Sequence, residues 1–338
     1  MTEANTDSIV WDDGWIQVKV PLPFSLKWVN SYLLPEDDGY TLIDPGLHTA
    51  QAVESWKHIF SRYGIRYSDI KQIVLTHHHP DHYGLAGWFQ EQTGAPVYMS
   101  QLSYNYTQRL WGAHRDFGDA LAGIYAQHGM PDALLEQIEP HFESFVQMVS
   151  PQPSIRPLEL SGIFRLGKLD WQIIHTPGHA NGHLCFYHGA SRRIICGDTV
   201  LPDITPNVSI MPDEDEDPLQ TFMNSLEALA KYEVSMAFPG HRNPFPDFAG
   251  RIGALLAHHD RRLQLMLDWL ERPVTAFEVC ELQFGERIKG NIHNLRFAMS
   301  ETLAHLQHLV KRGQAREEGQ NGVIRFVKSA RGYPISHL

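Results

Sequence analysis

The chain has little cysteine and no long apolar run. Its 338 residues include three cysteines, Cys185, Cys196 and Cys280, without a CxxC spacing. This scarcity argues against a disulfide-stapled secreted scaffold and predicts a reduced, cytoplasmic compartment. The first residues, MTEANTDSIV, lack the basic and apolar regions of a signal peptide, and no stretch is apolar for long enough to cross a bilayer. We therefore expect a protein that works without a membrane.

Positive charge is also scarce. The chain has 28 Lys and Arg against 39 Asp and Glu, which gives a formal net charge of -11. This balance disfavours a general binder of nucleic acid or of anionic membranes. Histidine, in contrast, is abundant, with 20 residues. The 43% hydrophobic content predicts a substantial core, in one large domain or in a domain with an appendage.

Strand patterns occur in both halves of the chain. Short apolar runs broken by Pro, Asp or Gly, and compact β-branched runs, are typical of strands, whereas helical spacing predicts helices between them. Residues 101–147 break this pattern, because they are aromatic-rich and helical without strand signals. We interpret them as a helical insertion over one face of a β-rich domain. Strands are expected at 15–23, 29–35, 40–46, 70–76, 95–100, 164–167, 169–178, 183–190, 192–200 and 234–241.

The region after Arg272 predicts a separate small unit. Residues 275–284 and 299–313 have helical patterns, and 314–329 reads as a hairpin that turns at an Asn-Gly pair. Helix, helix and hairpin resemble a winged helix. From Pro273 onward there are nine Lys and Arg and six Asp and Glu. Such a unit binds nucleic acid in some proteins and serves packing or dimerisation in others. A few positive charges give little affinity at physiological salt, so we favour packing.

One nine-residue stretch, THHHPDHYG at 76–84, concentrates four histidines and an aspartate directly after a predicted buried strand. His77 and His79 are two residues apart, so both side chains can turn toward one point. Asp81 and His82 begin the next element and can face a second point close by. Imidazole and carboxylate are ligands that suit zinc or iron, and no thiolate is involved. The stretch therefore predicts a metal site.

Three further motifs place metal-ligating side chains at strand ends. His179 lies in HTPGHANGH, Asp198 in CGDTV and His241 in FPGH. Each follows a predicted strand, so all three side chains can converge with the histidine cluster at one edge of the sheets. No GxSxG motif is present, and a serine or cysteine nucleophile is not required. Cys185 and Cys196 lie in apolar strands and are interpreted as core thiols.

In identity and order, these motifs resemble those of metallo-β-lactamase-fold hydrolases across roughly residues 10–248. That group includes glyoxalase II-like thioesterases, lactonases and lactamase-B-like nucleases with a similar tail. The resemblance implies an α/β protein with an αββα sandwich, in which 1–272 form the catalytic domain and 273–338 a winged-helix-like C-terminal unit. Two features depart from the family: the helical block is longer than in compact relatives, and Arg242 follows His241 where a small residue is common.

The resemblance also implies a dinuclear site with two divalent metal ions, most simply Zn²⁺, with iron or manganese as alternatives. A shared hydroxide would be the nucleophile, because metal binding lowers the pKa of water from about 15.7 toward about 7. Asp81 would both ligate and orient the attacking oxygen, as the catalytic residue. The implied ligands are His77, His79 and His179 for one ion, Asp81, His82 and His241 for the other, and Asp198 as a bridge, with Asp44 beside the site.

Other histidines and acids carry simpler interpretations. His78 should point away from its two neighbours and be no ligand. His183 and His188 flank a strand and are expected to be structural or on the surface. His258 and His259 lie on the predicted helix 249–271 and are expected to face solvent. The acidic run 213–217 is interpreted as a solvated loop and not as a cation site.

The insertion carries more aromatic residues than a solvent-exposed excursion needs. Tyr104, Tyr106, Trp111, Phe117 and Tyr125 are either ordinary helix core or part of a substrate pocket. We expect the insertion to cap the metal site, with Tyr106 and Trp111 lining the pocket. A dimer interface is the alternative, and a homodimer is left open.

Three function classes are compatible with these observations. The favoured one is a metal-dependent hydrolase of a small acyl ester, thioester or lactone, with a small-molecule acyl substrate as its partner. The aromatic insertion suits an apolar acyl group, and the acidic balance argues against long polyanions. The second class is a metal-dependent nuclease, which the tail supports and the charge opposes. The third is an iron-dependent oxygenase of the persulfide dioxygenase type, because the same fold can retain iron with an open position.

Overall fold

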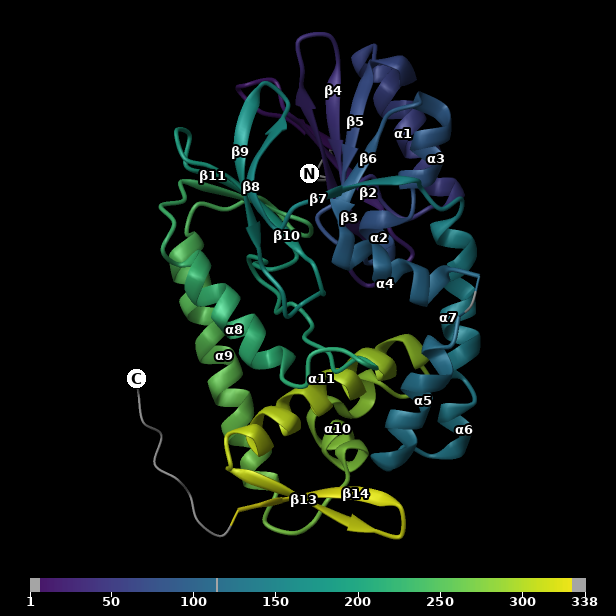
Figure 1. Ribbon diagram of the computed structural model, residues 1–338, viewed down its shortest axis with the longest axis vertical. Coiled ribbons are helices and arrows are strands. Elements are labelled where there is room, and N and C mark those ends of the chain that lie inside the picture. The colour runs from purple at the N-terminus through teal and green to yellow at the C-terminus, as the bar shows by residue number, and fades with distance from the viewer. Residues whose placement is uncertain (1–6, 114, 330–338) are drawn as a thin grey trace, which may run out of the picture.

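Two β-sheets form the centre of the computed structural model, which describes residues 7–113 and 115–329 (Figure 1). The strands of the first sheet follow one another in chain order. Its first half is antiparallel, and its last four strands are parallel. The sheet comprises β1 (Ser8–Val10), β2 (Ile16–Pro21), β3 (Trp28–Pro35), β4 (Tyr40–Ile43), β5 (Ile70–Val74), β6 (Val97–Ser100) and β7 (Ile155–Leu158).

The second sheet has the order β12-β11-β10-β9-β8. Its strands are antiparallel except for the parallel pair β11 and β12. The carboxyl ends of β9, β11 and β12 therefore point to the same edge. The strands are β8 (Ser161–Leu166), β9 (Leu169–His175), β10 (Leu184–His188), β11 (Arg193–Gly197) and β12 (Met236–Pro239).

The sheets pack face to face through a compact aromatic and aliphatic core. Trp15 packs on Trp171 with ring centroids 5.5 Å apart, and Tyr32 packs edge-on against Phe238. A larger apolar core joins the outer faces to the helices. The predicted αββα sandwich is confirmed. Its outer helices are α1 (Ala50–Tyr63) and α3 (Ala86–Thr93) on the first sheet, with α8 (Pro218–Leu229) and α9 (Phe248–Trp269) beyond the second.

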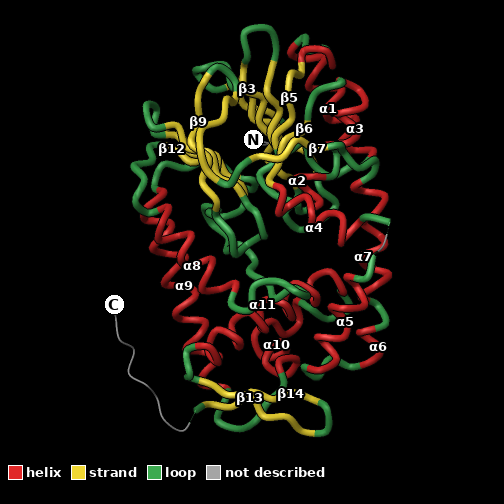
Figure 2. Tube along the Cα trace, viewed as in Figure 1, coloured by secondary structure: helices red, strands yellow, loops and turns green. Residues whose placement is uncertain are grey.

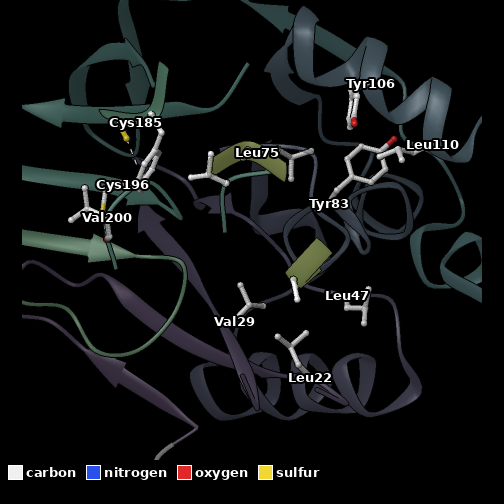
Figure 3. Close-up of a cluster of buried hydrophobic side chains, with 14 of the residues drawn as sticks. Leu22, Val29, Leu47, Leu75, Tyr83, Tyr106, Leu110, Cys185, Cys196 and Val200 are labelled. Carbon is white, nitrogen blue, oxygen red and sulfur yellow. Dashed lines mark hydrogen bonds between the residues drawn. The ribbon is translucent and has the colours of Figure 1, made fainter. Parts of the chain in front are cut away.

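The thiols of Cys185 and Cys196 lie inside the larger apolar core (Figure 3). Cys185 and Cys196 come from adjacent strands and are fully buried. Burial raises the pKa of Cys185 to about 12, so its thiol stays protonated at neutral pH. Both side chains therefore act as small core residues, as the sequence predicted.

The described residues of the predicted insertion form helices joined by short loops. Its first helix begins where Ser100, at the end of β6, accepts a hydrogen bond from the Ser103 amide. The chain returns to the first sheet through β7, a strand that the sequence did not predict. The helices are α4 (Gln101–Trp111), α5 (Phe117–Gln127), α6 (Asp132–Leu135) and α7 (Ile138–Val146), and η2 (Gln147–Val149) follows.

The C-terminal residues form the predicted helix, helix and hairpin. Thr275 and Glu278 make a reciprocal capping box at the first helix. The hairpin turns at Asn321 and Gly322, both with positive φ. The second helix begins at Ile292, seven residues earlier than predicted. The elements are α10 (Ala276–Phe284), η3 (Gly285–Arg287), α11 (Ile292–Lys311), β13 (Ala315–Gln320) and β14 (Val323–Lys328).

Helix α11 does not stand apart from the rest of the molecule. It contacts α7, α8 and α9, and it lies across from the sheets between the insertion on one side and α8 and α9 on the other (Figures 1 and 2). Residues on both sides of the predicted boundary at 272 therefore pack together. Within 7–113 and 115–329, no helix is long and apolar enough to span a membrane.

Candidate metal centre

Strand ends deliver the predicted ligands to one edge of the sandwich. His77 and His79 follow β5, and the short helix α2 (Pro80–Tyr83) presents the next two candidates. Because β9, β11 and β12 all end at this edge, the residues after them arrive there as well. The structure thus brings together His77, His79, Asp81, His82, His179, Asp198 and His241.

The seven side chains form overlapping groups whose ligand atoms lie within 4.8 Å of one another. His77, His79 and His179 make one group, and Asp81, His82 and His241 make another. Asp198 lies between them: its Oδ2 is 3.8 Å from His179 Nε2 and 3.3 Å from His241 Nε2. Its Oδ1 is 3.4 Å from His82 Nε2. This arrangement suits two cations that share the Asp198 carboxylate.

Most of the ligand imidazoles are fixed through Nδ1, so that Nε2 faces the centre. A hydrogen bond at the ring nitrogen that faces away from the metal orients the ring and selects its tautomer. The Nδ1 contacts are His77 with Thr76 Oγ1 (2.9 Å), His82 with Asp44 Oδ2 (2.9 Å), His179 with the Asn207 carbonyl (2.7 Å) and His241 with the Trp28 carbonyl (3.0 Å).

Asp44 organises the first sheet's contribution. Its carboxylate accepts hydrogen bonds from the Thr76 amide (2.8 Å) and hydroxyl (2.7 Å) and also contacts His82. The residue follows β4 and has a positive φ of 49°, which is uncommon outside glycine. The parallel pairing of β4 with β5 places Asp44 beside Thr76. One carboxylate therefore fixes both the start of the histidine stretch and one ligand ring.

The donor set fits metal ions because its inward-facing atoms have no protein partner. His77, His82, His179 and His241 each bury an Nε2 atom without a hydrogen bond, and so does Asp198 Oδ1. Buried polar groups are almost always satisfied, and several orphan atoms aimed at one point indicate a bound ion. Nitrogen and carboxylate oxygen without sulfur suit zinc, iron or manganese.

The protonation preferences agree with a cation site. Burial disfavours a charged His241, yet Asp198 and Asp81 raise its pKa to about 10. Burial and neighbouring histidines instead hold the pKa of His77 and His79 well below the usual range. The carboxylates thus attract positive charge on one side, and the other side offers neutral imidazoles, the form that binds metals.

Two residues that the sequence did not flag support the centre. The Gly240 Cβ position is filled by neighbours, since an added Cβ would lie 2.2 Å from Asp198 Oδ1. Asn30 on β3 donates through Nδ2 to the carbonyls of Pro239 (3.0 Å) and Arg242 (2.6 Å), on either side of His241. Asn30 therefore clamps the loop of the second sheet to the first. Only the packing of the two sheets reveals these roles.

His183 and His78 lie next to the centre without belonging to the ligand groups. His183 is buried and contacts Thr176 and Thr199, while its Nε2 accepts from the Asp198 amide at 3.2 Å. It is therefore structural, and it positions Asp198. His78 is buried against Tyr106, with ring centroids 4.4 Å apart.

The remaining histidine and acid predictions had mixed outcomes. His188 bonds to Ser191 near a strand end, as a structural residue would. The prediction that His259 is solvated was wrong: it is fully buried and contacts His305 at 3.1 Å, because α11 packs over α9. The acidic run 213–217 is a loop with mostly exposed side chains, although Asp217 caps α8 and bonds to His308.

A cavity of about 280 Å³ opens onto the ligand groups. Asp81, Asp198 and several ligand histidines form one wall, whereas the facing walls are largely apolar. The insertion contributes Tyr106, Trp111 and Phe117, but Tyr125 bonds instead to the Arg296 carbonyl and Ser300. Arg242 does not line the cavity and pairs with Asp203 at 3.3 Å. Further lining residues are Phe24, Leu110, Phe142, Phe145, Leu201, Ile204, Asn207, Met211, His293, Arg296 and Phe297.

Besides the loop at 24–26 between β2 and β3, two lining segments were not identified from the sequence. One is the loop after Asp198, at 201–211, which has no regular pattern. The other is the beginning of α11, where His293, Arg296 and Phe297 face the cavity. The only local signal for this earlier start is Asn291, whose side chain accepts from the Asn294 amide as a helix cap.

The sequence profile of the Metallo-beta-lactamase superfamily matches residues 29–241, and that of the Metallo-beta-lactamase-like C-terminal domain matches 263–329. The chain belongs to the metallo-β-lactamase superfamily. The first match covers all seven candidate ligands and the strands from β3 to β12, but not β1 or β2. The chain is therefore a metal-dependent hydrolase of this superfamily, as the motifs predicted, and its C-terminal unit is a recurring partner of the fold.

Known proteins similar to this chain span most of its length. The probable metallo-hydrolase YqjP of Bacillus subtilis is 30% identical over 306 residues, which is 87% of this chain and 91% of that protein. A metallo-beta-lactamase family protein from Thermus thermophilus is 33% identical with a TM-score of 0.83, covering 93% of this chain and 98% of that one. A beta-lactamase domain protein from Burkholderia ambifaria is 30% identical with a TM-score of 0.84, covering 95% and 94%.

A more distant similarity concerns proteins with a named thioester substrate. The atrochrysone carboxyl ACP thioesterase AgnL7 of Paecilomyces divaricatus is 24% identical over 250 residues. The match covers 74% of this chain and 61% of the thioesterase.

Proposed function

We propose that this hydrolase uses two metal ions, most simply zinc, to cleave small acyl thioesters. The observation that carries the proposal is the cavity, which joins the paired ligand groups on one wall to aromatic walls on the others. Such a cavity accepts an apolar acyl chain while its reactive carbonyl lies at the ligand wall. The distant likeness to fungal acyl carrier protein thioesterases supports a thioester over a lactone or an ordinary ester.

The proposal assigns each candidate ligand a role. His77, His79 and His179 would hold one ion, and Asp81, His82 and His241 the other, with Asp198 shared. When bound, the ions would polarise the substrate carbonyl and supply a nucleophilic oxygen at neutral pH. Asp198 would also offset the repulsion between two dications. His183, through the Asp198 amide, and Asp44, through His82, would hold these ligands in place.

The residues of the chain have further tasks during hydrolysis. The Asp81 carboxylate lines the cavity and lies 3.1 Å from His241 Nε2, so it can accept a proton from the attacking water and orient its oxygen. Tyr106, Trp111 and Phe117 would bind the acyl chain and exclude bulk water. The sulfur of a thioester can leave as a thiolate, so the arrangement requires no dedicated general acid to protonate the leaving group.

The cavity also bears on the alternative functions. Aromatic side chains from the insertion and from α11 line it, which suits a small acyl group better than a folded polynucleotide. Helix α11 belongs to the winged-helix-like unit, so this unit would serve packing and substrate binding instead of nucleic-acid binding. An iron-dependent oxygenase would need one tightly held iron and an open second position, whereas both ligand groups are complete here.

The test combines elemental analysis with a substrate panel. We expect two metal ions per chain in protein purified without added metal, and hydrolysis of acyl thioesters faster than that of lactones, phosphodiesters or single-stranded RNA. Removal of the ions by a chelator should abolish hydrolysis, and added Zn²⁺ should restore it. A single iron per chain with oxygen-dependent turnover would contradict the proposal, as would cleavage of RNA alone.

A further inference from the structure

One buried cation lies in the cavity without a described acidic partner. Arg296, in the second turn of α11, is only 7% exposed and lines the cavity. It is the only arginine or lysine among the described residues that line it. A guanidinium carries five donors and always holds its charge, so its burial is costly unless an anion or several acceptors surround it.

The protein partners of Arg296 are aromatic. Its guanidinium lies 3.9 Å from the ring centroid of Phe297 and 5.0 Å from that of Phe142. Its buried Nε has no hydrogen-bond partner among the described residues. Burial lowers its pKa, and among the described residues Tyr125 and Tyr106 oppose this shift. The two rings pack against the guanidinium and leave its buried Nε without a hydrogen bond among the described residues.

The surroundings of Arg296 contrast with those of Arg262, a partly buried arginine on the neighbouring helix α9. Arg262 on α9 pairs with Glu301 on α11. Within the described part of the chain, the carboxylates on the ligand wall form no ion pair with Arg296. Burial and Arg296 lower the pKa of His293 to about 4, and Asp81 opposes this shift. His293 is therefore neutral at pH 7 and adds no second charge.

We propose that Arg296 binds a carboxylate at the far end of the substrate's acyl chain, so that the preferred substrates are monothioesters of dicarboxylic acids. This inference rests on the proposed thioesterase function. The thioester carbonyl would lie at the ligand wall, and the terminal carboxylate would receive the bidentate hydrogen bonds that the guanidinium does not make within the protein. Phe142 and Phe297 would exclude water from this pair and strengthen it.

The anion is assigned to the acyl chain because of where Arg296 lies. Its side chain is buried among residues of α7 and α11, whereas a leaving thiol has to depart toward solvent. A phosphate on a phosphopantetheine thiol is the competing source of negative charge. The two sources are separable, since the acyl group and the thiol of a thioester can be varied independently.

The experiment compares matched thioesters of N-acetylcysteamine, a small neutral thiol, with the metal-loaded enzyme. The pairs are succinyl with butyryl, glutaryl with pentanoyl, and adipyl with hexanoyl. We expect kcat/KM to favour the carboxylated member by at least about 10-fold for one chain length. Equal values, or a preference for all neutral members, would overturn the inference. The inference would also be overturned if thioesters with neutral acyl groups reacted well only when phosphopantetheine was the thiol.

Substitutions separate anion binding from a structural role. Arg296→Met should lower kcat/KM for the carboxylated substrate by roughly 100-fold, mainly through KM, and leave the neutral one nearly unchanged. Arg296→Lys keeps the charge and should retain part of the preference. Arg109→Met is the matched control, because Arg109 also lies over an aromatic ring of the cavity, Phe117, but pairs with Asp213. It should keep the full preference.

If Arg296→Met lowers kcat/KM equally for the carboxylated and the neutral substrate, Arg296 only supports the fold. Calorimetry provides a readout without turnover: glutarate should bind the wild-type enzyme more tightly than pentanoate, and equally in Arg296→Met. If no thioester is hydrolysed but glutarate binding depends on Arg296, the proposed thioesterase function fails and the anion site stands. If thioesters are hydrolysed without any preference for a carboxylate, the proposed thioesterase function stands and the anion site fails.

Discussion

The two ends of the cavity are built in different ways. At the ligand wall, the histidines follow strand ends or, like His82, lie on the short helix α2, and most are fixed by a hydrogen bond from the sandwich itself, as His82 is by Asp44. At the opposite end, side chains from the insertion, the loop 201–211 and α11 meet through apolar contacts. The first end is dense in polar partners and the second has few. Under the proposed function, this difference would separate the residues that carry out the reaction from those that select the substrate.

The largest expected effect lies at the ligand wall. Asp198→Ala removes the carboxylate shared by both ligand groups and leaves buried histidines without a counter-charge. It should lose metal and activity together. The loss in each should exceed the roughly 10- to 100-fold loss expected when a residue that only supports a ligand is replaced. Elemental analysis and kcat/KM measure this. His78→Ala, in the same stretch but outside the ligand groups, should retain both ions; damage equal to that of His79→Ala would contradict the ligand assignment.

A smaller effect is expected one layer outward. Asp44→Ala removes the acceptor for Thr76 and for His82 Nδ1, so the His82 ring loses its orientation. Metal affinity should fall by about 10- to 100-fold, while saturating metal restores much of the activity. Titration against a competing chelator measures the affinity. An unchanged affinity would show that the ligand wall tolerates the loss of its supporting hydrogen bonds.

At the apolar end the effect should appear in substrate binding alone. Trp111 stacks on Tyr83 with centroids 5.5 Å apart and lines the cavity. Trp111→Leu should raise KM for long acyl chains by about 10-fold and affect short chains less. The metal content should not change. Unaltered kinetics together with loss of an oligomer would instead identify the insertion as a dimer interface.

The smallest effect concerns how the insertion docks on α11. Tyr125 donates its hydroxyl proton to the Arg296 carbonyl at 2.9 Å and also contacts Ser300. Tyr125→Phe should lower the free energy of unfolding by about 1 kcal/mol, because it leaves a buried acceptor unsatisfied. Urea unfolding measures this. The kinetic constants should stay near wild-type values, and a large loss of kcat would mean that this contact also shapes the reactive end.

The sequence by itself determined the family and the sandwich, and it identified the residues that the structure groups as candidate ligands. This was achievable because most candidates lie shortly after a strand whose apolar pattern is readable locally, as His77 does after β5 and His241 after β12, and the others follow His79 in the same short stretch. Parallel strands then bring their carboxyl ends to one edge. The short spacing of His77, His79 and His82 also indicates that their side chains can reach one site.

Only the tertiary structure decided what faces those ligands. Arg296 lies in a part of α11 that carried no clear helical pattern, and nothing in its neighbourhood along the chain indicates that Phe142 and the insertion meet it. His259 was expected in solvent and is buried because α11 crosses α9. Such positions depend on contacts between distant segments. The insertion and α11, for example, are more than a hundred residues apart along the chain. Local periodicity cannot report these contacts, because they arise only when the helices pack.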